Sequence, residues 1–379
     1  MVSTIKFSEH LISQQFEYAF GISVADISGN GYLDIIATDT NVGLYWFENI
    51  GNGNFLRHVI HRRRGEWLER HAVADINGDG KPEIISVDNI NGCLLYFEFN
   101  GDPRLEESWT YTYITEGGLP GAYDLAIGDF CGNGNLDIVG SGWRIGNQFA
   151  LFENSSDEWN KHILDENASE NRTVCTADVN GNGRPDVIGT ISDGGQVVWY
   201  ENPEKSTGPK WPKHVIDVAP RPIHGHPVDI NGNGKVDIVM ALGMDSAQDS
   251  SSMNLRTGNS HENQQQIVWY ENPGKPHDSQ WEKHIICPDF PQAFEAVAGD
   301  IDGDGEIEVV ATAWGEQGML AFFKHRGNPK GPWDMHLIKE NWTNANMVIL
   351  ADLDKDGKLE IVASAERGSN EIRWWKIHF

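Results

Sequence analysis

A nine-residue acidic motif recurs seven times along the chain, and this repetition limits the possible folds more than any other feature. Its pattern is D-x-[DNSC]-[GK]-[DN]-G-x-x-[DE], followed by two residues that favour β-strands. Successive copies begin 49, 54, 49, 51, 71 and 52 residues apart. A near-constant period of this length is typical of repeat architectures, in which each unit is one supersecondary element. The seven copies begin at Asp26, Asp75, Asp129, Asp178, Asp229, Asp300 and Asp352.

Two further motifs follow each acidic motif and supply more strands. The first is an aromatic strand, best preserved in residues 46–49, 199–202 and 269–272, where it ends in Glu-Asn. The second reads aromatic-x-x-His-x-Ile or close to it, as from Trp211 to His214. Each unit therefore contains four short strands, with the Gly-rich acidic turn between the first two. Seven such units predict an all-β, seven-bladed β-propeller with four antiparallel strands in each blade.

The two ends of the chain predict how the ring closes. The seventh unit ends on its aromatic strand, at residues 374–375, without a His-x-Ile strand after it. Residues 7–12 match the missing motif. We therefore expect the N-terminal strand to complete the last blade, which closes the ring and hides sheet edges that would otherwise pair with other chains. Residues 1–379 are then a single propeller domain.

Composition and charge exclude several classes of partner. The chain has 379 residues, 29 Lys and Arg against 56 Asp and Glu, and a formal net charge of −27. Nucleic acids and anionic membranes attract basic surfaces, so we expect neither as a partner. No apolar run reaches the ~18–20 residues that span a bilayer. The 14 Trp, 15 Phe and 9 Tyr residues supply large surfaces for a core. We expect a monomer.

Two features of the sequence bear on its compartment. The chain begins MVSTIKF, without the apolar segment of a signal peptide. Asn154, Asn167, Asn171 and Asn341 each begin an N-x-[ST] glycosylation motif, which is used only in secreted proteins. The four cysteines show no CxxC spacing, so a zinc ribbon is disfavoured. We favour an extracellular location, with the leader absent from this sequence.

The acidic turns resemble calcium loops, because carboxylates at positions 1, 3, 5 and 9 can converge on one hard cation. Only two of the seven copies carry four acids, whereas the others carry two or three. For the copies with two acids, we expect the Asp and Asn side chains to hydrogen-bond the turn backbone instead. In the four-acid copies a structural calcium ion and the same backbone role both remain open. The eight candidate ligands are Asp300, Asp302, Asp304 and Glu308, and Asp352, Asp354, Asp356 and Glu360.

The topology of a propeller separates its two faces. The acidic turns connect the first strand of each blade to the second, so they lie on one face. The opposite face carries the connections between blades, and propeller ligands usually bind there, around the central channel. Nine of the fourteen arginines fall on this second face, together with the one long insertion, residues 241–266, which contains His261. Arginine suits carboxylate or sulfate recognition, so we expect an anionic ligand. The alternative is that these arginines pair with neighbouring acids such as Glu66 and Glu69.

The hairpin motif resembles the FG-GAP/VCBS repeat of integrin-type propellers, and the resemblance covers nearly the whole chain. Propellers of this repeat type include polysaccharide lyases that cleave uronic-acid glycans, such as ulvan lyases and rhamnose–glucuronate lyases. The resemblance implies β-elimination. In that reaction an arginine or a metal neutralises the uronate carboxylate, a histidine or tyrosine removes the adjacent proton, and a second group protonates the leaving oxygen.

The ligand face offers residues of the required types for each of these roles. We expect Arg70 and Arg172 as neutralisers, His71 or His224 as the base, and Tyr123 as the acid. Trp143 and Trp314 are expected to stack on sugar rings. The remaining candidates for substrate binding are Arg144, His226, His261 and Glu295.

We therefore predict a carbon–oxygen lyase that acts on an anionic, uronate-bearing polysaccharide in the central funnel. The main alternative is a non-catalytic propeller that binds a glycan or a protein, in the manner of an integrin or a lectin. A lectin with repeated pockets would keep equal residues in each blade, whereas the inner ends of these blades differ. A metal-dependent hydrolase is disfavoured, because no HExxH or comparable ligand spacing occurs.

Overall fold

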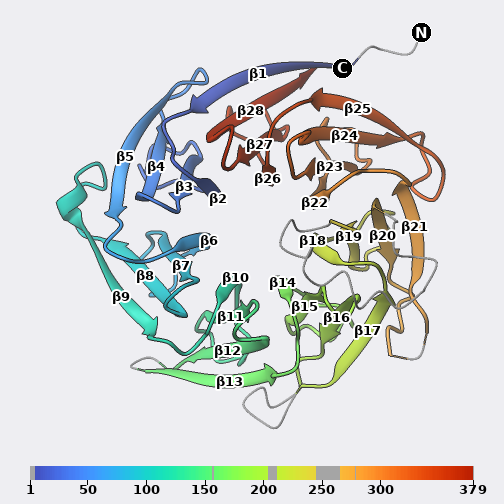
Figure 1. The fold of residues 1–379 in the computed structure, drawn as a ribbon, viewed down its shortest axis with the longest axis horizontal. Helices are drawn as coiled ribbons and strands as arrows, with labels where there is room; N and C mark the ends of the chain where they lie inside the picture. Colours follow the sequence, from blue (N-terminus) through green and yellow to red (C-terminus); the bar gives the residue numbers. More distant parts are fainter. Residues whose placement is uncertain (1–4, 156–157, 204–210, 245–264, 278, 379) are drawn as a thin grey trace.

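Seven four-stranded antiparallel sheets stand around a central axis and form a β-propeller (Figure 1). The computed structural model describes residues 5–155, 158–203, 211–244, 265–277 and 279–378. Within each sheet, consecutive strands pair from the centre to the rim, and we call them strands a, b, c and d. The predicted number of blades and strands is confirmed.

Short strands of five to eight residues make up all seven blades. Blades one to four consist of β2 (Ala19–Ala25), β3 (Asp34–Asp39), β4 (Gly43–Asn49) and β5 (Phe55–Arg62); β6 (Leu68–Ala74), β7 (Glu83–Asp88), β8 (Cys93–Phe99) and β9 (Trp109–Thr115); β10 (Ala122–Gly128), β11 (Asp137–Gly142), β12 (Gln148–Asn154) and β13 (Trp159–Asp165); and β14 (Asn171–Ala177), β15 (Asp186–Ile191), β16 (Gln196–Tyr200) and β17 (Lys213–Val218). Blades five to seven consist of β18 (Pro222–Val228), β19 (Asp237–Leu242), β20 (Gln266–Glu271) and β21 (Glu282–Cys287); β22 (Ala293–Gly299), β23 (Glu308–Ala313), β24 (Met319–His325) and β25 (Trp333–Lys339); and β26 (Ala345–Ala351), β27 (Glu360–Ala365), β28 (Glu371–His378) and β1 (Lys6–Ser13). Among the described residues the only helix is a single 3₁₀ turn, η1 (Glu106–Ser108), and none could cross a membrane.

The N-terminal strand closes the ring. β1 pairs antiparallel with β28 as the outermost strand of blade seven, with Phe7 opposite Ile377 and Glu9 opposite Trp375. Figure 1 shows the blue N-terminal strand beside the red C-terminal one. The edge of blade seven is therefore covered by the other end of the chain, as the motif at residues 7–12 predicts.

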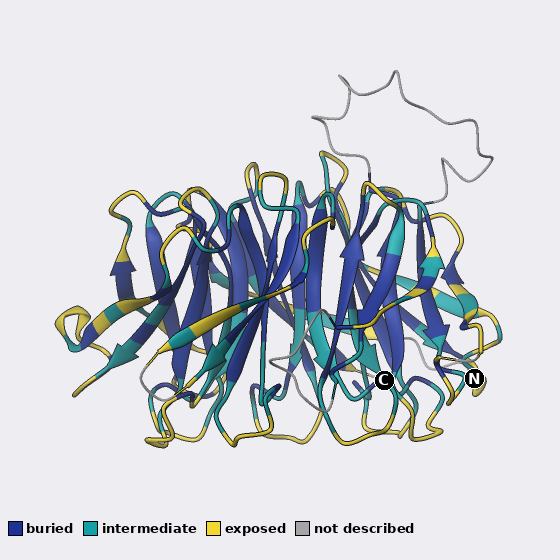
Figure 2. Ribbon diagram, turned by 90° about the horizontal axis from the view of Figure 1, so that it is seen from below, coloured by how far each residue is buried: buried dark blue, intermediate teal, exposed yellow. Residues whose placement is uncertain are grey.

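The hydrophobic core lies between neighbouring blades. Strands b and c are buried almost throughout, whereas strand d exposes much of its outer side, so the exposed residues lie at the rim and in the loops (Figure 2). The indoles of Trp46, Trp199 and Trp269 are fully buried. Trp269 of blade five shares one cluster with Phe323 of blade six. Because each cluster joins two blades, a blade buries its apolar faces only when the ring is complete.

The histidine that recurs in strand d has a packing role. The ring of His214 stacks on Trp199 with centroids 4.4 Å apart, and its Nε2 lies 3.3 Å from Glu201. His284 likewise stacks on Trp269, at 4.3 Å. A residue that answers the same packing need in several blades is a poor candidate for a unique site.

In the copies of the acidic turn that carry only two acids, both carboxylates accept hydrogen bonds from the backbone, as blade four shows. In blade four, Asp178 accepts the backbone N–H of Gly183 at 2.7 Å, and Gly183 has a φ of +83°, which favours glycine. The last acid, Asp186, accepts the N–H groups of Val179 at 3.0 Å and of Asn202 at 2.8 Å. These carboxylates hold the a–b hairpin and join it to the end of strand c.

Candidate ligand site in the central channel

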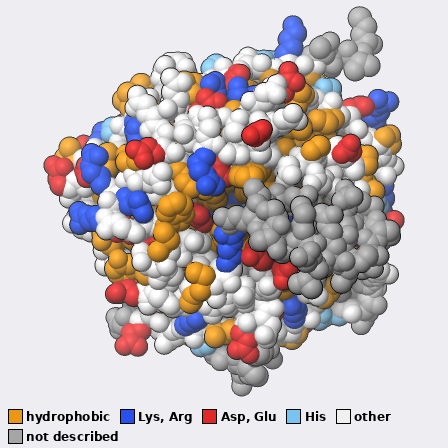
Figure 3. Space-filling view, viewed as in Figure 1, with side chains coloured by type: hydrophobic (Ala, Val, Ile, Leu, Met, Phe, Trp, Pro, Cys, Tyr) orange, Lys and Arg blue, Asp and Glu red, His pale blue; other side chains and the backbone are white. Residues whose placement is uncertain are grey.

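A cavity of about 640 Å³ opens at the centre of the ring, on the face that carries the d–a and b–c connections. Figure 3 looks onto this face, where hydrophobic and basic side chains gather near the centre. Aromatic side chains dominate the lining, and they include Tyr18, Phe20, Trp67, Tyr123, Trp143 and Trp314. Charged side chains from different blades complete it, namely Glu69, Arg144, Arg172, Glu366 and Arg367.

An irregularity in every strand a aims side chains into the channel. The pairing of strands a and b shifts register near the start of strand a in all seven blades. Tyr123 lies within the shift between Ala122 and Asp124, and Arg172 within the shift between Asn171 and Val174. β-Bulges re-aim side chains in this way, and they are over-represented beside functional sites. In five of the seven blades the second residue of strand a lines the cavity: Phe20, Glu69, Tyr123, Arg172 and Phe294.

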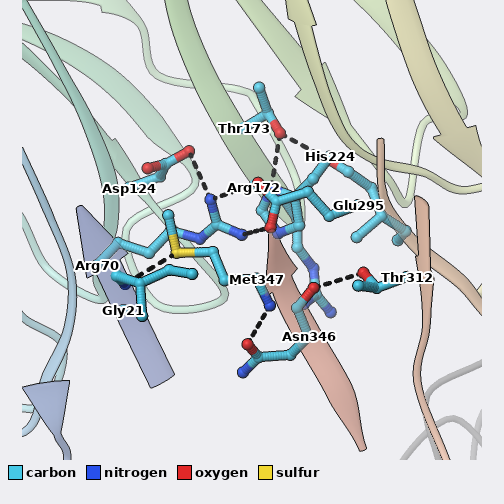
Figure 4. A network of polar contacts seen from close by, with 12 residues as sticks. Gly21, Arg70, Asp124, Arg172, Thr173, His224, Glu295, Thr312, Asn346 and Met347 are labelled. Atoms are coloured by element: carbon cyan, nitrogen blue, oxygen red, sulfur yellow. Dashed lines mark hydrogen bonds and ion pairs between the residues drawn. The ribbon is translucent and has the colours of Figure 1, made fainter. Parts of the chain in front are cut away.

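Arg70 is not part of the cavity lining and lies in a buried ion-pair network (Figure 4). Its Nη2 is 2.9 Å from Glu295 Oε2, and its Nη1 is 4.0 Å from Asp124 Oδ2. Glu295 is fully buried and also lies 3.1 Å from His226 Nε2. Burial opposes the ionisation of Glu295, but the Arg70 charge outweighs it and lowers the pKa of this carboxyl. Arg70 and Glu295, predicted for catalysis and substrate binding, do not line the cavity but neutralise each other.

Arg172, in contrast, lines the cavity without an ionic partner. Its guanidinium lies 4.3 Å from the ring centroid of Trp143 and 5.5 Å from that of Tyr123, and its Nη1 is 3.5 Å from the Tyr123 hydroxyl. Among the described residues no carboxylate lies within salt-bridge distance of it, although the side chain is only 4% exposed. A buried guanidinium held by aromatic rings and one hydroxyl, without a carboxylate, leaves its positive charge for a ligand.

Tyr123 and His224 form a hydrogen-bonded pair beside Arg172. The Tyr123 hydroxyl lies 3.1 Å from His224 Nε2, and His224 Nδ1 lies 2.7 Å from Thr173 Oγ1. The Thr173 hydroxyl donates to the carbonyl of Ile223 at 2.9 Å, so it accepts from Nδ1–H. This assigns the Nε2 lone pair as the acceptor of the Tyr123 proton. Burial lowers the pKa of His224 well below its usual range, and burial raises that of Tyr123 despite Arg172 nearby.

Two other predicted histidines, His71 and His226, do not line the cavity. His71 is buried, and burial lowers its pKa to about 3. It contributes no surface to the cavity, so its predicted role as a base has no geometric support. His226 contacts Glu295 and does not line the cavity. His261 lies outside the described residues.

The predicted stacking residues do line the cavity. The Trp143 indole donates to Glu170 at 2.6 Å, and Arg144 lies 3.8 Å from the Trp143 ring centroid. The Trp314 indole donates to Glu366. Carboxylates thus fix the orientation of both indoles through their N–H groups, while the Arg144 and Arg172 guanidiniums lie over the Trp143 ring.

Several lining residues have no role predicted from the sequence, although one signal points to them. Glu69 is the second residue of β6, the position that Phe20, Tyr123 and Arg172 occupy in their own strands. Aligning the seven inner strands would therefore have found it. Tyr18 and Trp67 precede their inner strands, in segments that follow no repeat pattern.

Comparison with known families agrees with the repeat analysis. FG-GAP-like repeats match residues 26–86, 75–140, 147–240 and 300–363. The chain belongs to the FG-GAP-like repeat family. No curated protein matches the sequence.

Solved structures resemble this FG-GAP-like propeller over nearly its whole length. BBS1N, in a complex with ARL6DN soaked with mercury, is 8% identical with a TM-score of 0.60, covering 97% of this chain and 95% of that chain. BBS1N in the lead-soaked complex is 6% identical with a TM-score of 0.59, covering 96% of this chain and 94% of that chain. Raptor from Chaetomium thermophilum is 10% identical with a TM-score of 0.59, covering 97% of this chain and 28% of that chain. At these identities the likeness concerns the fold alone.

The two four-acid FG-GAP-like turns already contain a cation from the chain. Lys324 Nζ of β24 lies 2.7 Å from Asp302, 2.9 Å from Asp304 and 2.6 Å from Glu308. In blade seven, Lys376 of β28 makes the equivalent contacts, with Nζ 2.7 Å from Asp356. The carboxylates converge as predicted, but on an ammonium. As these side chains lie, a calcium ion would have to displace the lysine, so the site does not fit calcium.

A charge exchange within the repeat supports this interpretation. The strand-c position of Lys324 and Lys376 holds a glutamate in the other five blades, as in Glu201 of blade four. Position 3 of the turn is Asp only in the two blades with lysine. In blade four the same two positions hold a neutral and an acidic residue: the Asn180 amide of the turn donates to Glu201 of strand c at 3.2 Å. Aspartate at position 3 of the turn and lysine in strand c therefore occur together, in blades six and seven.

We expect a chelator to leave the melting temperature of the protein unchanged, which calorimetry in EDTA would measure. Lys324→Met should lower stability, on the order of 1–2 kcal/mol, because it leaves buried and half-buried carboxylates facing one another. Added calcium should then restore part of the loss. Lys81→Met, on a half-buried lysine 3.8 Å from Asp79 of the three-acid turn, is the control. A chelator that lowers the melting temperature of the unmodified protein would support a resident calcium ion instead.

Proposed function

We propose that this protein is a lyase that cleaves a uronic-acid-containing polysaccharide by β-elimination in the central cavity. The observation that carries the proposal is Arg172, which is buried in the cavity wall without a carboxylate partner among the described residues. Arg70, one blade away from Tyr123, has two carboxylates near it. Because Arg172 is the one cation of the described cavity lining without a carboxylate partner, it is suited to bind the carboxylate of a ligand.

Neutralising a uronate carboxylate is the step that makes β-elimination possible. The proton on the carbon next to the carboxylate is removed as negative charge develops on the carboxylate oxygens. A guanidinium held in a nearly dry site stabilises that charge much more strongly than one in water. Trp143 and Tyr123 hold the Arg172 guanidinium from their ring faces, so it is oriented before the ligand binds.

Tyr123 is the best-placed base. Tyr123 lines the cavity, whereas His224 does not, and the Tyr123 hydroxyl lies 3.1 Å from His224 Nε2. Since the His224 Nε2 lone pair accepts the Tyr123 proton, Tyr123 can take a proton from the substrate while its own proton passes to His224. This differs from the roles predicted from the sequence, in which His71 or His224 was the base and Tyr123 the acid.

The aromatic lining favours a saccharide ligand. Trp143 and Trp314 both line the cavity, and their N–H groups are engaged by Glu170 and Glu366. Apolar ring faces bordered by charged hydrogen-bonding groups suit a pyranose, which has apolar C–H faces and a polar edge.

An extracellular location belongs to this proposal, because polymeric glycans of this kind are encountered outside the cell. Asn167 and Asn341, two of the four glycosylation motifs, have exposed side chains. Asn171 is fully buried, and its amide donates to the Gln148 carbonyl at 2.6 Å, so the folded protein cannot carry a glycan there.

The test is incubation of the protein with a panel of glucuronate- and iduronate-bearing glycans, followed by ultraviolet absorbance of the unsaturated uronate product. We expect product from at least one glycan. Tyr123→Phe should lower kcat about 10²- to 10⁴-fold, the usual contribution of a general base, while the melting temperature stays close to that of the wild type.

The matched control is Tyr113→Phe, on a tyrosine of β9 at the rim that is 40% exposed. Its product formation should equal that of the wild type. Binding of a uronate glycan without product would favour the non-catalytic glycan-binding propeller. Neither binding nor product with the whole panel would overturn the proposal.

A further inference from the structure

Glu69 is a buried carboxyl group at the cavity wall with one free oxygen. It is the second residue of β6 and only 5% exposed. Its Oε1 accepts the indole N–H of Trp67 at 2.9 Å. Its Oε2 is buried and has no hydrogen-bond partner among the described residues. A buried carboxyl oxygen without a donor is costly in the ionised form, and it calls for a proton or a ligand.

The second acid of the cavity, Glu366, is held differently. Its Oε1 accepts the indole N–H of Trp314, and its Oε2 accepts from Arg367 Nε at 3.3 Å. Both oxygens of Glu366 thus act as acceptors, as those of an ionised carboxylate do. The two acids have unequal surroundings, which is how proteins separate the roles of a carboxyl pair.

The charges around Glu69 come from several blades. Burial raises its pKa most strongly, and the nearby Glu366 raises it further. The Trp67 N–H, Arg172 and Arg70 lower it. Tyr18, which lies beside both acids, is itself kept protonated by burial and by their charge, which raise its pKa. The balance raises the pKa of Glu69 to about 7, so the carboxyl group holds a proton in a large share of molecules at neutral pH.

We propose that Glu69 is the general acid of the cavity and donates its proton to the oxygen that leaves in the elimination. This inference rests on the function proposed above, which lacks such a donor once Tyr123 is the base. Arg172 and Glu69 line the same cavity, so a uronate held by the guanidinium has the carboxyl group within the same enclosure.

The complete step conserves atoms and charge. The bond between C5 and its hydrogen breaks, and the proton passes to Tyr123 while the Tyr123 proton passes to His224. The electron pair of that bond becomes the C4=C5 double bond. The bond from C4 to the glycosidic oxygen breaks, and that oxygen takes the Glu69 proton. His224 ends as an imidazolium and Glu69 as a carboxylate, and solvent returns the proton between turnovers.

The test compares Glu69→Gln on two substrates. Glutamine keeps the size and a hydrogen-bond donor but has no proton to transfer. On the natural glycan, kcat should fall about 10²-fold or more. On a uronate that carries a nitrophenoxy group at C4, which leaves without protonation, the loss should be less than about fivefold. Equal losses on both substrates would show a structural role, and no loss on the glycan would show that Glu69 is not the acid.

The pH dependence gives a second readout. In the wild type, kcat/KM on the glycan should fall above about pH 7, because the Glu69 carboxyl group loses its proton there, and Glu69→Gln should remove this limb. Glu316→Gln, an exposed glutamate on the same face, is the matched control and should leave rate and profile unchanged.

A titration that needs no substrate separates this inference from the proposed function. Side-chain carboxyl carbons, labelled with ¹³C and followed by NMR in the free protein, should include one that titrates near pH 7 and is absent in Glu69→Gln. If no such signal is found, the assignment of Glu69 as the general acid is wrong, even if the protein is a lyase. If the signal is present but no uronate glycan or aryloxy uronate reacts, the lyase proposal fails, and the general-acid role fails with it.

Discussion

Replacing Arg172 by methionine is expected to abolish most activity on a uronate glycan without unfolding the propeller. Loss of one preorganised group that stabilises developing negative charge costs about 10²–10³ in kcat, and the lost ground-state contact to the carboxylate should raise KM as well. Stability should change little, because Arg172 has no carboxylate partner among the described residues that its removal would leave unpaired.

Steady-state kinetics with the unsaturated-product assay measure this effect, and a melting curve checks the fold. Arg62→Met is the matched control, since Arg62 has a side chain 60% exposed and pairs with Glu106 at the rim. Arg172→Lys should recover only part of the activity, because an ammonium cannot form two parallel hydrogen bonds to a carboxylate. Full activity in Arg172→Met would remove the basis of the proposed function.

Replacing Arg70 by methionine is expected to have the opposite profile, with a large loss of stability. The change leaves Glu295 fully buried and without its principal counter-charge. Breaking one side of a buried pair costs about 3–5 kcal/mol, because the remaining charge has no water to solvate it. Asp124 loses a nearby positive charge at the same time.

Urea denaturation followed by tryptophan fluorescence measures the loss. The double variant Arg70→Met/Glu295→Gln should be more stable than Arg70→Met alone, because it no longer buries an unpaired carboxylate. An unfolding midpoint for Arg70→Met that matches the wild type would mean that Glu295 is neutral in the native protein and that the ion pair is not formed.

The contrast between these two arginines shows what the sequence analysis could predict. Both were assigned to the ligand face and to the same role, since each follows the start of an inner strand. The assignment to the face is supported by the structure for Arg172, which lines the cavity. The partner of Arg70, however, is Glu295 from blade six, separated by 225 residues. No local pattern relates two residues at that separation.

The histidines illustrate the same limit. His71 and His224 both occur near the inner ends of strands, and the sequence treats them alike. In the folded chain His224 contacts Tyr123, whereas His71 is buried away from the cavity lining. The difference arises from the position of each bulge relative to the channel, and a bulge depends on pairing between strands rather than on composition.

The sequence by itself determined the ring: seven units, four strands in each, the closure by residues 7–12 and the face on which ligands would meet unlike side chains. It could do so because turn chemistry and strand alternation are local, and sevenfold repetition makes each signal unmistakable. Only the tertiary structure decided which charged side chains pair with one another within the protein and which remain available to a ligand. That outcome depends on distances between blades, because ion pairing and burial are set by neighbours that meet only when the ring closes.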